Sequence, residues 1–290
     1  MNDIRKCLTA VTLVMSFLSS YLVIDAQQNE SRVDETLPEE IASIARHRQE
    51  QIERELANSQ SSEWAGVYGA IEDLTTSVML FWTPASGFMV WRESCSRPGV
   101  AQVNYGSVNF NGSSLTPSPE RTERNRHTYD ISSGFVPVRW GEQHWLIPSD
   151  KLILFCYAIN SGSFEEIESF FLKAGDNEKP REGLPEVPSE YKKYLGVEPI
   201  EAEVSAVGTR NERWYPPLTL NVGRAEGVVA GMKFYLIKSE NINMHLDVTD
   251  VREHTSVTRV VMAGVSGDND DEIRPAVGWK FSSRLPEGSW

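Results

Sequence analysis

The sequence is poor in the residues and motifs that identify enzymes and nucleic-acid-binding proteins. It has five histidines and three cysteines, and it contains no H-E-x-x-H, C-x-x-C, G-x-S-x-G or P-loop pattern. Its 28 basic residues are outnumbered by 41 acidic ones, which gives a formal net charge of -13, and no block of Lys and Arg offsets this. Because an acidic surface repels phosphate backbones, we expect no nucleic-acid partner. We also expect no cofactor and no metal ion.

One long uncharged run is present, at the N-terminus. Residues 8–24 carry no charge, follow Arg5 and Lys6, and precede Ala26. This order of a basic segment, an apolar segment and a small residue is typical of a signal peptide. We therefore expect residues 1–26 to direct export to the periplasm or the outside of the cell. An uncleaved signal anchor is the alternative, and only then would the protein contact a membrane.

Export would leave Cys95 and Cys156 in an oxidising compartment, which permits a disulfide between them. The alternative is that each is a separate buried thiol that packs as a small apolar side chain. Spacing along the chain does not place the two Cα atoms within bonding range. Both alternatives therefore stay open.

The rest of the chain divides by composition into a helical segment and two β-rich parts. With 290 residues, 40% of them hydrophobic, the chain is long enough for about two domains. We expect a polar segment and amphipathic helix at 27–62, a β-rich domain at 64–176, a linker at 177–197 and a small β-barrel at 198–290. The fold class is thus mainly β, with an N-terminal helix, then a β-meander or barrel-like domain with one inserted helix, then a small C-terminal β-barrel.

The helix and strands follow from apolar periodicity and turn residues. The helix has apolar residues near one face: Leu37, Ile41, Ile44, Ile52 and Leu56. This pattern predicts a partner-binding or self-associating helix, and the alternative is a helix packed on its own domain or a solvated stalk after the membrane. Strands are predicted in the first β region at 77–82, 87–91, 105–110, 113–116, 135–140, 143–147 and 170–173, with a helix over 152–159. Strands are predicted in the second at 202–207, 218–222, 233–237, 246–251, 257–262 and 279–283. Asn111-Gly112 predicts a type I′ turn, and Gly141-Glu142 predicts a tight turn.

Residues 134–162 concentrate the candidate chemistry. Glu142 and His144 are the acid–base candidates, because alternate residues near a strand point to one face while Trp145 points to the other. The alternative is a surface ion pair near a turn. The acidic run 268–272 resembles a Ca²⁺-binding loop only in its oxygen ligands, and we interpret it as a solvated hairpin tip.

Four tryptophans of the first β region are candidates for binding, because aromatic faces stack on sugars and other flat surfaces: Trp82, Trp91, Trp140 and Trp145. The alternative is that they pack in the core of the domain. The glycines Gly223, Gly227 and Gly231 lack the pattern of a phosphate-binding loop, and they predict turns at barrel corners instead.

The segment VPVRWGEQHWLIP is followed by a predicted helix and later by the segment LNVGRAEGVVAGMKFYL. Through these features most of residues 64–285 resemble a set of uncharacterised bacterial exported proteins. The segment Gly227–Met232 is also similar to the small β-barrels of cell-envelope scaffold proteins, including the rod-shape-determining and flagellar-assembly families. These resemblances imply an interaction role by analogy of fold, and they assign no functional residue.

No motif identifies the function. The best expectation is a non-enzymatic, exported binding or scaffold protein of the cell envelope, with an unknown protein or glycan partner. The first alternative is a small-ligand carrier, if residues 64–176 close into a barrel with an interior cavity. The second is an unrecognised hydrolase that uses His144 and Glu142.

Overall fold

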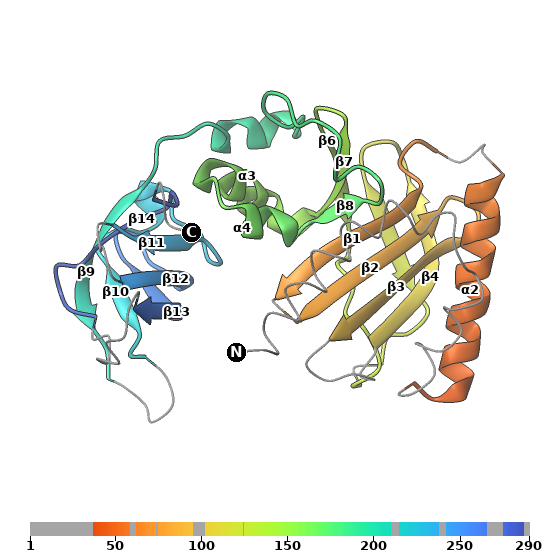
Figure 1. Ribbon diagram of the computed structural model, residues 1–290, viewed down its shortest axis with the longest axis horizontal. Coiled ribbons are helices and arrows are strands. Elements are labelled where there is room, and N and C mark those ends of the chain that lie inside the picture. The colour runs from red at the N-terminus through yellow and green to blue at the C-terminus, as the bar shows by residue number, and fades with distance from the viewer. Residues whose placement is uncertain are drawn as a thin grey trace. The chain divides into compact units, whose positions relative to one another are not determined.

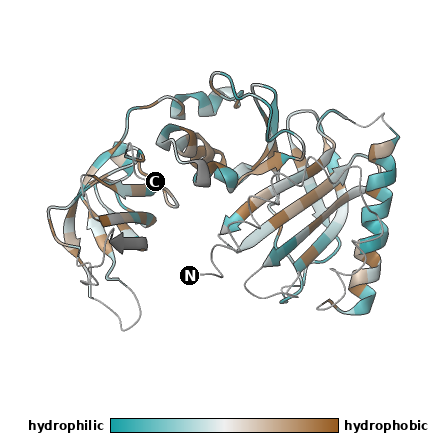
Figure 2. Ribbon diagram, viewed as in Figure 1, coloured by the Kyte–Doolittle hydropathy of each residue, from teal (hydrophilic) through white to brown (hydrophobic). Residues whose placement is uncertain are grey.

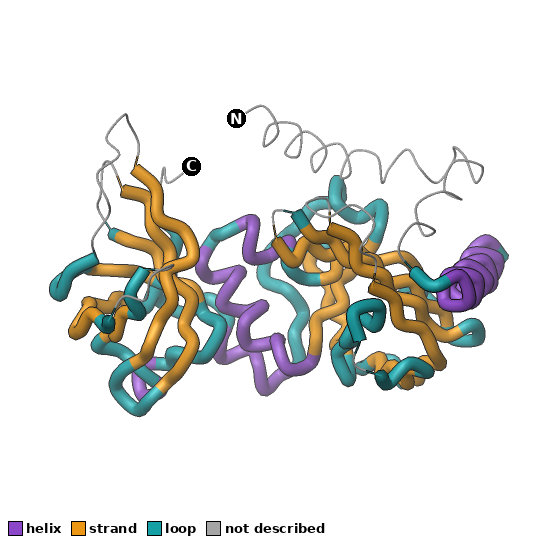
Figure 3. Tube along the Cα trace, turned by 90° about the horizontal axis from the view of Figure 1, so that it is seen from below, coloured by secondary structure: helices purple, strands orange, loops and turns teal. Residues whose placement is uncertain are grey.

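The computed structural model describes residues 37–58, 62–73, 75–94, 102–123, 125–209, 215–237, 242–265 and 275–286 (Figure 1). The predicted signal segment, Cys95 and the acidic run at 268–272 lie outside these residues. The described chain is mainly β, with an N-terminal helix and two closed barrels, which confirms the predicted fold class (Figure 3).

Contacts divide the chain into two compact units. One unit holds the described residues up to Leu152 together with Glu168–Pro188, and the other holds Ile153–Ile167 and the described residues from Ser189 onward. These bounds differ from the predicted domains at 64–176 and 198–290, because the helical segment after the first barrel shares its contacts with the second unit.

The first unit is built on an antiparallel barrel, here called barrel 1, whose strands pair in chain order. They are β1 (Gly66–Asp73), β2 (Thr76–Thr83), β3 (Gly87–Ser94), β4 (Gln102–Phe110), β5 (Leu115–Pro119), β6 (Phe135–Trp140), β7 (Gln143–Pro148) and β8 (Phe171–Lys173). All but β1 overlap a predicted strand. Strand β8 pairs with both β7 and β1, which closes the barrel.

The interior of barrel 1 is filled by side chains that alternate along the strands. Tyr68, Leu80, Trp82, Phe88 and Leu146 are fully buried in one cluster. Complete burial of each such side chain is worth about 2 kcal/mol relative to leaving it exposed. Barrel 1 therefore has a packed core over most of its length and is not an open tube.

Helix α2 (Glu39–Ala57) packs on the outer face of β2, β3 and β4 (Figure 1). Its buried Ala45 and Ile52 contact Phe81, Met89 and Tyr105 of these strands. Hydrophilic and hydrophobic residues both occur along α2 (Figure 2), as expected of a helix with one buried side. Of the interpretations of this helix, packing on its own domain is the one observed.

Glu55 of α2 also fixes the predicted β2–β3 hairpin. Its carboxylate accepts hydrogen bonds from the Thr83 hydroxyl at 2.6 Å, the Ala85 amide at 3.1 Å and the Ser86 amide at 2.8 Å. Burial alone would raise the pKa of Glu55, but the hydrogen bonds outweigh it and hold the pKa below its ordinary value. The helix is thus joined to the barrel by polar as well as apolar contacts.

Two predicted turns have different outcomes. Trp140 pairs directly with Gln143, so the Gly141-Glu142 turn is confirmed. Phe110 pairs with Leu115, so the loop at Asn111 has four residues and the predicted type I′ turn is wrong. The reason is that the Asn111 side chain accepts hydrogen bonds from the amides of Ser113 and Ser114, which favours a wider turn.

The second unit contains helices and a smaller barrel, here called barrel 2. The short helix η2 (Ser149–Lys151) ends the first part of the first unit and leads into α3 (Leu152–Ser161). Helices α3, α4 (Phe164–Glu168) and η3 (Ser189–Tyr194) belong mainly to the second unit. Barrel 2 is ordered β10-β13-β12-β11-β14-β9. Its strands are β9 (Glu201–Val207), β10 (Leu218–Leu220), β11 (Lys233–Leu236), β12 (Ile242–Val251), β13 (Ser256–Val265) and β14 (Lys280–Ser282).

Helix α3 belongs to the packing of the second unit. The Tyr157 hydroxyl donates to the Gly227 carbonyl oxygen at 2.7 Å, and the ring contacts the core of barrel 2. Gly223 is required at its corner, because a Cβ there would lie 2.4 Å from the Arg252 carbonyl oxygen. The glycine series thus forms corner turns, as predicted. Among the described residues no helix has both the length and the apolar character needed to cross a membrane.

Candidate functional site

Polar residues of barrel 1 gather at its two ends. The histidine end is formed by Glu63 and Trp64 before β1, by His144 at the start of β7, and by Asp176 in the turn after β8. The cavity end is formed by the last residues of β1 and β7 and by the first residues of β6 and β8. The two groups lie at opposite ends of β1 and of β7.

His144 is the centre of the histidine end. Its amide and its ring Nδ1 both lie within hydrogen-bond distance of Asp176 Oδ2, at 2.8 Å and 2.7 Å, and Nε2 lies 3.1 Å from Glu63 Oε1. Lys179 Nζ lies 2.5 Å from Asp176 Oδ1. The Gln143 side-chain amide donates to the carbonyl oxygens of Asp176 and Lys179. These contacts hold the start of β7 against the turn after β8.

Burial and hydrogen bonding set the charges in this cluster. Only 4% of the Asp176 side chain and 12% of the His144 side chain are exposed. Burial alone would raise the pKa of Asp176, but the hydrogen bonds from Lys179 and His144 outweigh it and lower the pKa. Burial lowers the pKa of His144, and Asp176 opposes this only in part. At neutral pH Asp176 is therefore a carboxylate that accepts a hydrogen bond from the neutral His144 imidazole.

The cluster has the groups of an acid–base pair but no nucleophile. Among the described residues no serine, threonine or cysteine side chain forms a hydrogen bond with His144. Nε2 faces Glu63, which the Arg139 guanidinium also binds. The Trp64 ring lies edge-on to the imidazole, with 5.1 Å between centroids. Both ring nitrogens therefore face carboxylates that also join separate segments of the chain, and the neutral ring can donate to only one of them.

The predicted partner of His144 is not the one observed. Glu142 lies exposed in the β6–β7 turn, and its side chain has no partner among the described residues. Its amide donates to Pro180, and Gly141 lies so close to the same segment that a Cβ would come within 2.4 Å of the Pro180 carbonyl oxygen. Asp176 is missed by sequence reasoning because Gly175-Asp176-Asn177 indicates only the end of a strand.

The four tryptophan candidates do not form one surface. Trp82 is fully buried and Trp145 is 2% exposed, so both pack inside the fold. Trp91 contacts the cluster under α2. Trp140 is half-buried, donates from its ring nitrogen to Gly183, and is covered by the Arg181 guanidinium, which lies 5.2 Å from the ring centroid. None of the four lines the cavity described next.

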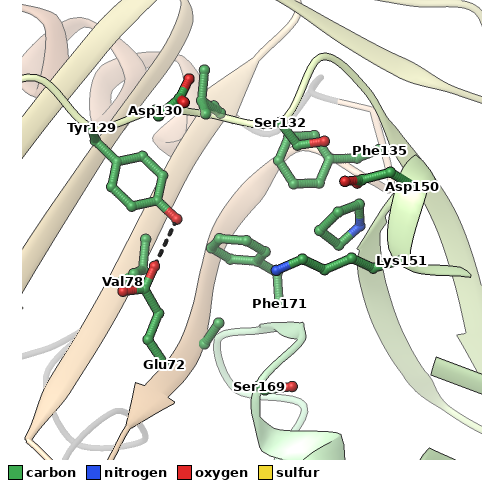
Figure 4. A pocket seen from close by; sticks show the side chains of 13 residues that line it. Glu72, Val78, Tyr129, Asp130, Ser132, Phe135, Asp150, Lys151, Ser169 and Phe171 are labelled. Atoms are coloured by element: carbon green, nitrogen blue, oxygen red, sulfur yellow. Dashed lines mark hydrogen bonds between the residues drawn. The ribbon is translucent and has the colours of Figure 1, made fainter. Parts of the chain in front are cut away.

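A cavity of about 260 Å³ opens at the cavity end of barrel 1 (Figure 4). Its floor is the end of the barrel core, since four of its apolar lining residues belong to the same buried cluster as Trp82. The apolar lining residues are Ala70, Val78, Ile131, Phe135, Pro148 and Phe171. The cavity is thus a gap at one end of an otherwise filled barrel.

Charged and hydroxyl groups form the remaining wall. Glu72 accepts a hydrogen bond from the Tyr129 hydroxyl at 3.0 Å and lies 2.5 Å from Arg92 Nε, so its charge is compensated. Burial raises the pKa of Tyr129, and the nearby Glu72 raises it further, so the phenol stays protonated. Asp150 and Lys151 of η2 also line the cavity, and neither side chain has a partner among the described residues.

A second cluster of titratable groups lies in the second unit. The Tyr235 hydroxyl donates to Glu166 of α4, and burial raises the pKa of that carboxyl group. His245 pairs with Tyr235 in the sheet, and burial lowers its pKa. These contacts join α4 to the wall of barrel 2.

Cys156 is a buried free thiol in α3. Burial raises its pKa to about 11, so it is unreactive as a nucleophile at neutral pH. No disulfide occurs in the part of the chain that the structure describes, and Cys95 lies outside that part, so both alternatives for the two cysteines stay open. Among the described residues no group of acidic, histidine or cysteine side chains is arranged to hold a metal ion.

Sequence and fold comparisons add no assignment to this geometry. The chain matches no protein-family model, no curated protein and no solved structure.

Proposed function

We propose that this protein is a non-catalytic binding protein, exported to the cell envelope, that holds a small ligand in barrel 1. The cavity at the end of barrel 1 is the observation that carries the proposal, since mouths of β-barrels are frequent ligand sites. Its volume of about 260 Å³ lies just below the roughly 300–1,000 Å³ of sites for drug-sized molecules. The ligand is therefore small, on the scale of a single-ring compound.

The composition of the wall supports binding. Ligand sites combine a mainly apolar surface with a few polar groups that orient the ligand. Here the apolar floor of Phe135, Phe171 and Val78 meets Asp150 and Lys151 at the rim. Both charged groups are exposed and have no partner in the described part of the chain, so each can form a hydrogen bond or ion pair with a ligand at the rim.

Catalysis is less well supported. The His144 ring is held by Asp176 and Glu63, and it lies away from the cavity. Asp150 and Lys151 line the cavity without a histidine or a serine nucleophile bound to either of them. The hydrolase alternative would need Glu63 to leave His144 and a nucleophile to reach it.

A scaffold role for barrel 2 is the second candidate. Its support is the small closed barrel itself, together with the resemblance of Gly227–Met232 to envelope scaffold barrels. Export is part of both proposals, and it depends on the pattern of residues 1–26. Cell fractionation followed by cross-linking and mass spectrometry tests both points. Recovery in the cytoplasm would contradict export, and recovery of a stable envelope protein partner would support the scaffold role.

Saturation-transfer NMR with benzyl alcohol tests the proposed binding site. We expect the wild-type chain to transfer saturation to this probe, with a dissociation constant on the order of 1 mM for so small a molecule. Ser169→Phe places a ring at the exposed rim of the cavity and is expected to abolish the signal.

The matched control is Ser118→Phe, which adds the same ring at an exposed position of β5 that does not line the cavity. It is expected to keep the signal. If Ser169→Phe fails to fold by circular dichroism, Ser132→Phe fills the opposite rim. Equal signals in all variants, or none in the wild type, would overturn the proposal.

A further inference from the structure

We infer that the ligand of barrel 1 is a small organic cation, in which an ammonium group is attached to an apolar body. The inference rests on the proposed function, because it assigns the chemical class of the molecule that the cavity takes. It follows from the balance of charge in the wall, the aromatic rings and the field of the whole chain.

The charge balance of the wall is negative. Among the lining residues that the structure describes, Glu72, Asp130 and Asp150 carry carboxylates and Lys151 carries an ammonium group. Asp130 also has an interaction of its own within the chain. Arg92 compensates Glu72 from outside the lining. Asp150 has no partner in the described part of the chain, so its carboxylate is available to an incoming cation. A cation would complete the balance, whereas an anion would add a further negative charge.

Aromatic rings lie beside these carboxylates. Tyr129 is on the wall that holds Glu72, while Phe135 and Phe171 form the other side of the cavity (Figure 4). Ring faces attract an ammonium group electrostatically, by about 0.5–1 kcal/mol at exposed sites and more when water is excluded. In Figure 4 the Asp150 carboxylate is turned toward Phe135 and Ser132. An ammonium group placed there meets a carboxylate and a ring at once.

The net charge of the whole chain also favours a positively charged ligand. A formal net charge of -13 attracts cations to the surface and repels anions. Lys151 is the opposing group, and its side chain extends across the cavity toward Phe171 (Figure 4). It limits affinity for a cation and would be the contact for an anion, so it distinguishes the two classes of ligand.

Three probes of matched shape test the inference by saturation-transfer NMR titration at pH 7. Benzylammonium is the cation, benzyl alcohol is the neutral compound and benzoate is the anion. We expect benzylammonium to bind about fivefold more tightly than benzyl alcohol, as one partly exposed ion pair provides. Benzoate is expected to bind most weakly.

Single substitutions at the rim assign the effect to named groups. Asp150→Asn is expected to reduce the preference for benzylammonium toward that for benzyl alcohol. Lys151→Gln is expected to increase the preference for benzylammonium over benzyl alcohol about threefold and to weaken the binding of benzoate further. Glu142→Gln is the control, because it changes net charge as Asp150→Asn does but lies at the other end of β7. It is expected to leave all three affinities unchanged.

The outcomes separate this inference from the proposed function. Equal binding of the three probes would overturn the inference that the ligand is a cation, and so would tighter binding of benzoate that Lys151→Gln abolishes. Either result would leave the proposed binding site in place. Binding of no probe would overturn both. An equal loss of preference in Asp150→Asn and Glu142→Gln would show that net charge acts from a distance, and would also overturn the assignment to this cavity.

Discussion

The two ends of barrel 1 use charged residues in opposite ways. At the histidine end Asp176 is nearly buried, and its two oxygens are engaged by His144 and Lys179. At the cavity end Asp150 and Lys151 are exposed and have no partner among the described residues. Charges that are paired with one another close a barrel, while charges left beside an apolar gap are available to a ligand.

This contrast predicts the largest loss of stability at the histidine end. Asp176→Ala removes the acceptor of the His144 amide and ring, and it leaves the Lys179 ammonium without its partner. We expect the free energy of unfolding of barrel 1 to fall by about 3 kcal/mol, as for other nearly buried pairs that lose one member. Hydrogen exchange of the amides of β7 and β8, followed by mass spectrometry, measures this change for the barrel alone.

The matched control is Asp150→Ala at the cavity end. Because its carboxylate has no partner, we expect a change within about 0.5 kcal/mol. Equal losses in the two variants would contradict the contrast between the two ends.

The pH dependence of barrel 1 is expected to come from the histidine end. The pKa of His144 is lowered from 6.5, so the unfolded chain takes up a proton at a higher pH than the folded chain does. Stability therefore falls as pH drops below about 6.5 toward the folded pKa. The pKa of Asp176 is lowered from 3.8, so its contribution is present above that value and is lost as pH falls through the folded pKa.

Hydrogen exchange of β7 and β8 at pH 7 and pH 5 measures the first of these windows. His144→Asn removes the titrating group and is expected to reduce the difference in stability between the two pH values. An unchanged difference would show that another group carries the dependence. The readout is restricted to barrel 1, because His245 in barrel 2 also has a lowered pKa.

A smaller effect is expected from the ion pair at the cavity end. Arg92→Met removes the partner of Glu72, while the hydrogen bond from Tyr129 remains. Both side chains of the pair are about one-third exposed, so we expect a loss of about 1 kcal/mol in unfolding free energy. Benzylammonium should bind more tightly to this variant, since Glu72 is then uncompensated. A loss of unfolding free energy as large as that expected for Asp176→Ala would contradict the distinction between the histidine end and the cavity end.

The smallest effect is expected at Glu142, the partner that the sequence suggests for His144. Its side chain is exposed and has no partner among the described residues. Glu142→Ala should change the unfolding free energy by less than about 0.5 kcal/mol. The NMR titration of the His144 ring should also stay the same. A shifted pKa of His144 in this variant would contradict this expectation and would support Glu142 as the acid–base partner of His144.

Much of the fold could be predicted from local patterns. Alternation and turn residues locate the strands of barrel 2 and every strand of barrel 1 except β1. Strand β1 contains Gly66, Gly69, Ala70 and Asp73, which have low β propensity, and it forms because β2 and β8 pair with its two edges. The sequence places helix α3 in the first domain because it follows β7 directly, whereas the contacts of residues 153–161, among them that of Tyr157, assign it to the second unit.

The site could not be predicted in the same way. Asp176 lies 32 positions after His144, and Glu63 lies 81 positions before it. The cavity draws its lining from separate segments between Ala70 and Phe171, so no local spacing indicates it. The tryptophans attract attention in the sequence, yet Trp82 and Trp145 are needed for packing. Local patterns predict elements, while the site depends on how the closed barrel brings distant residues together.

Hydrogen exchange in the presence of benzylammonium tests the central claim most directly. The account predicts slower exchange in peptides that cover residues 129–135 and 148–152, which contain residues of the cavity wall, and no change in peptides that cover His144 or Asp176. Protection at the histidine end, or no protection in either place at a saturating concentration of the probe, would contradict it.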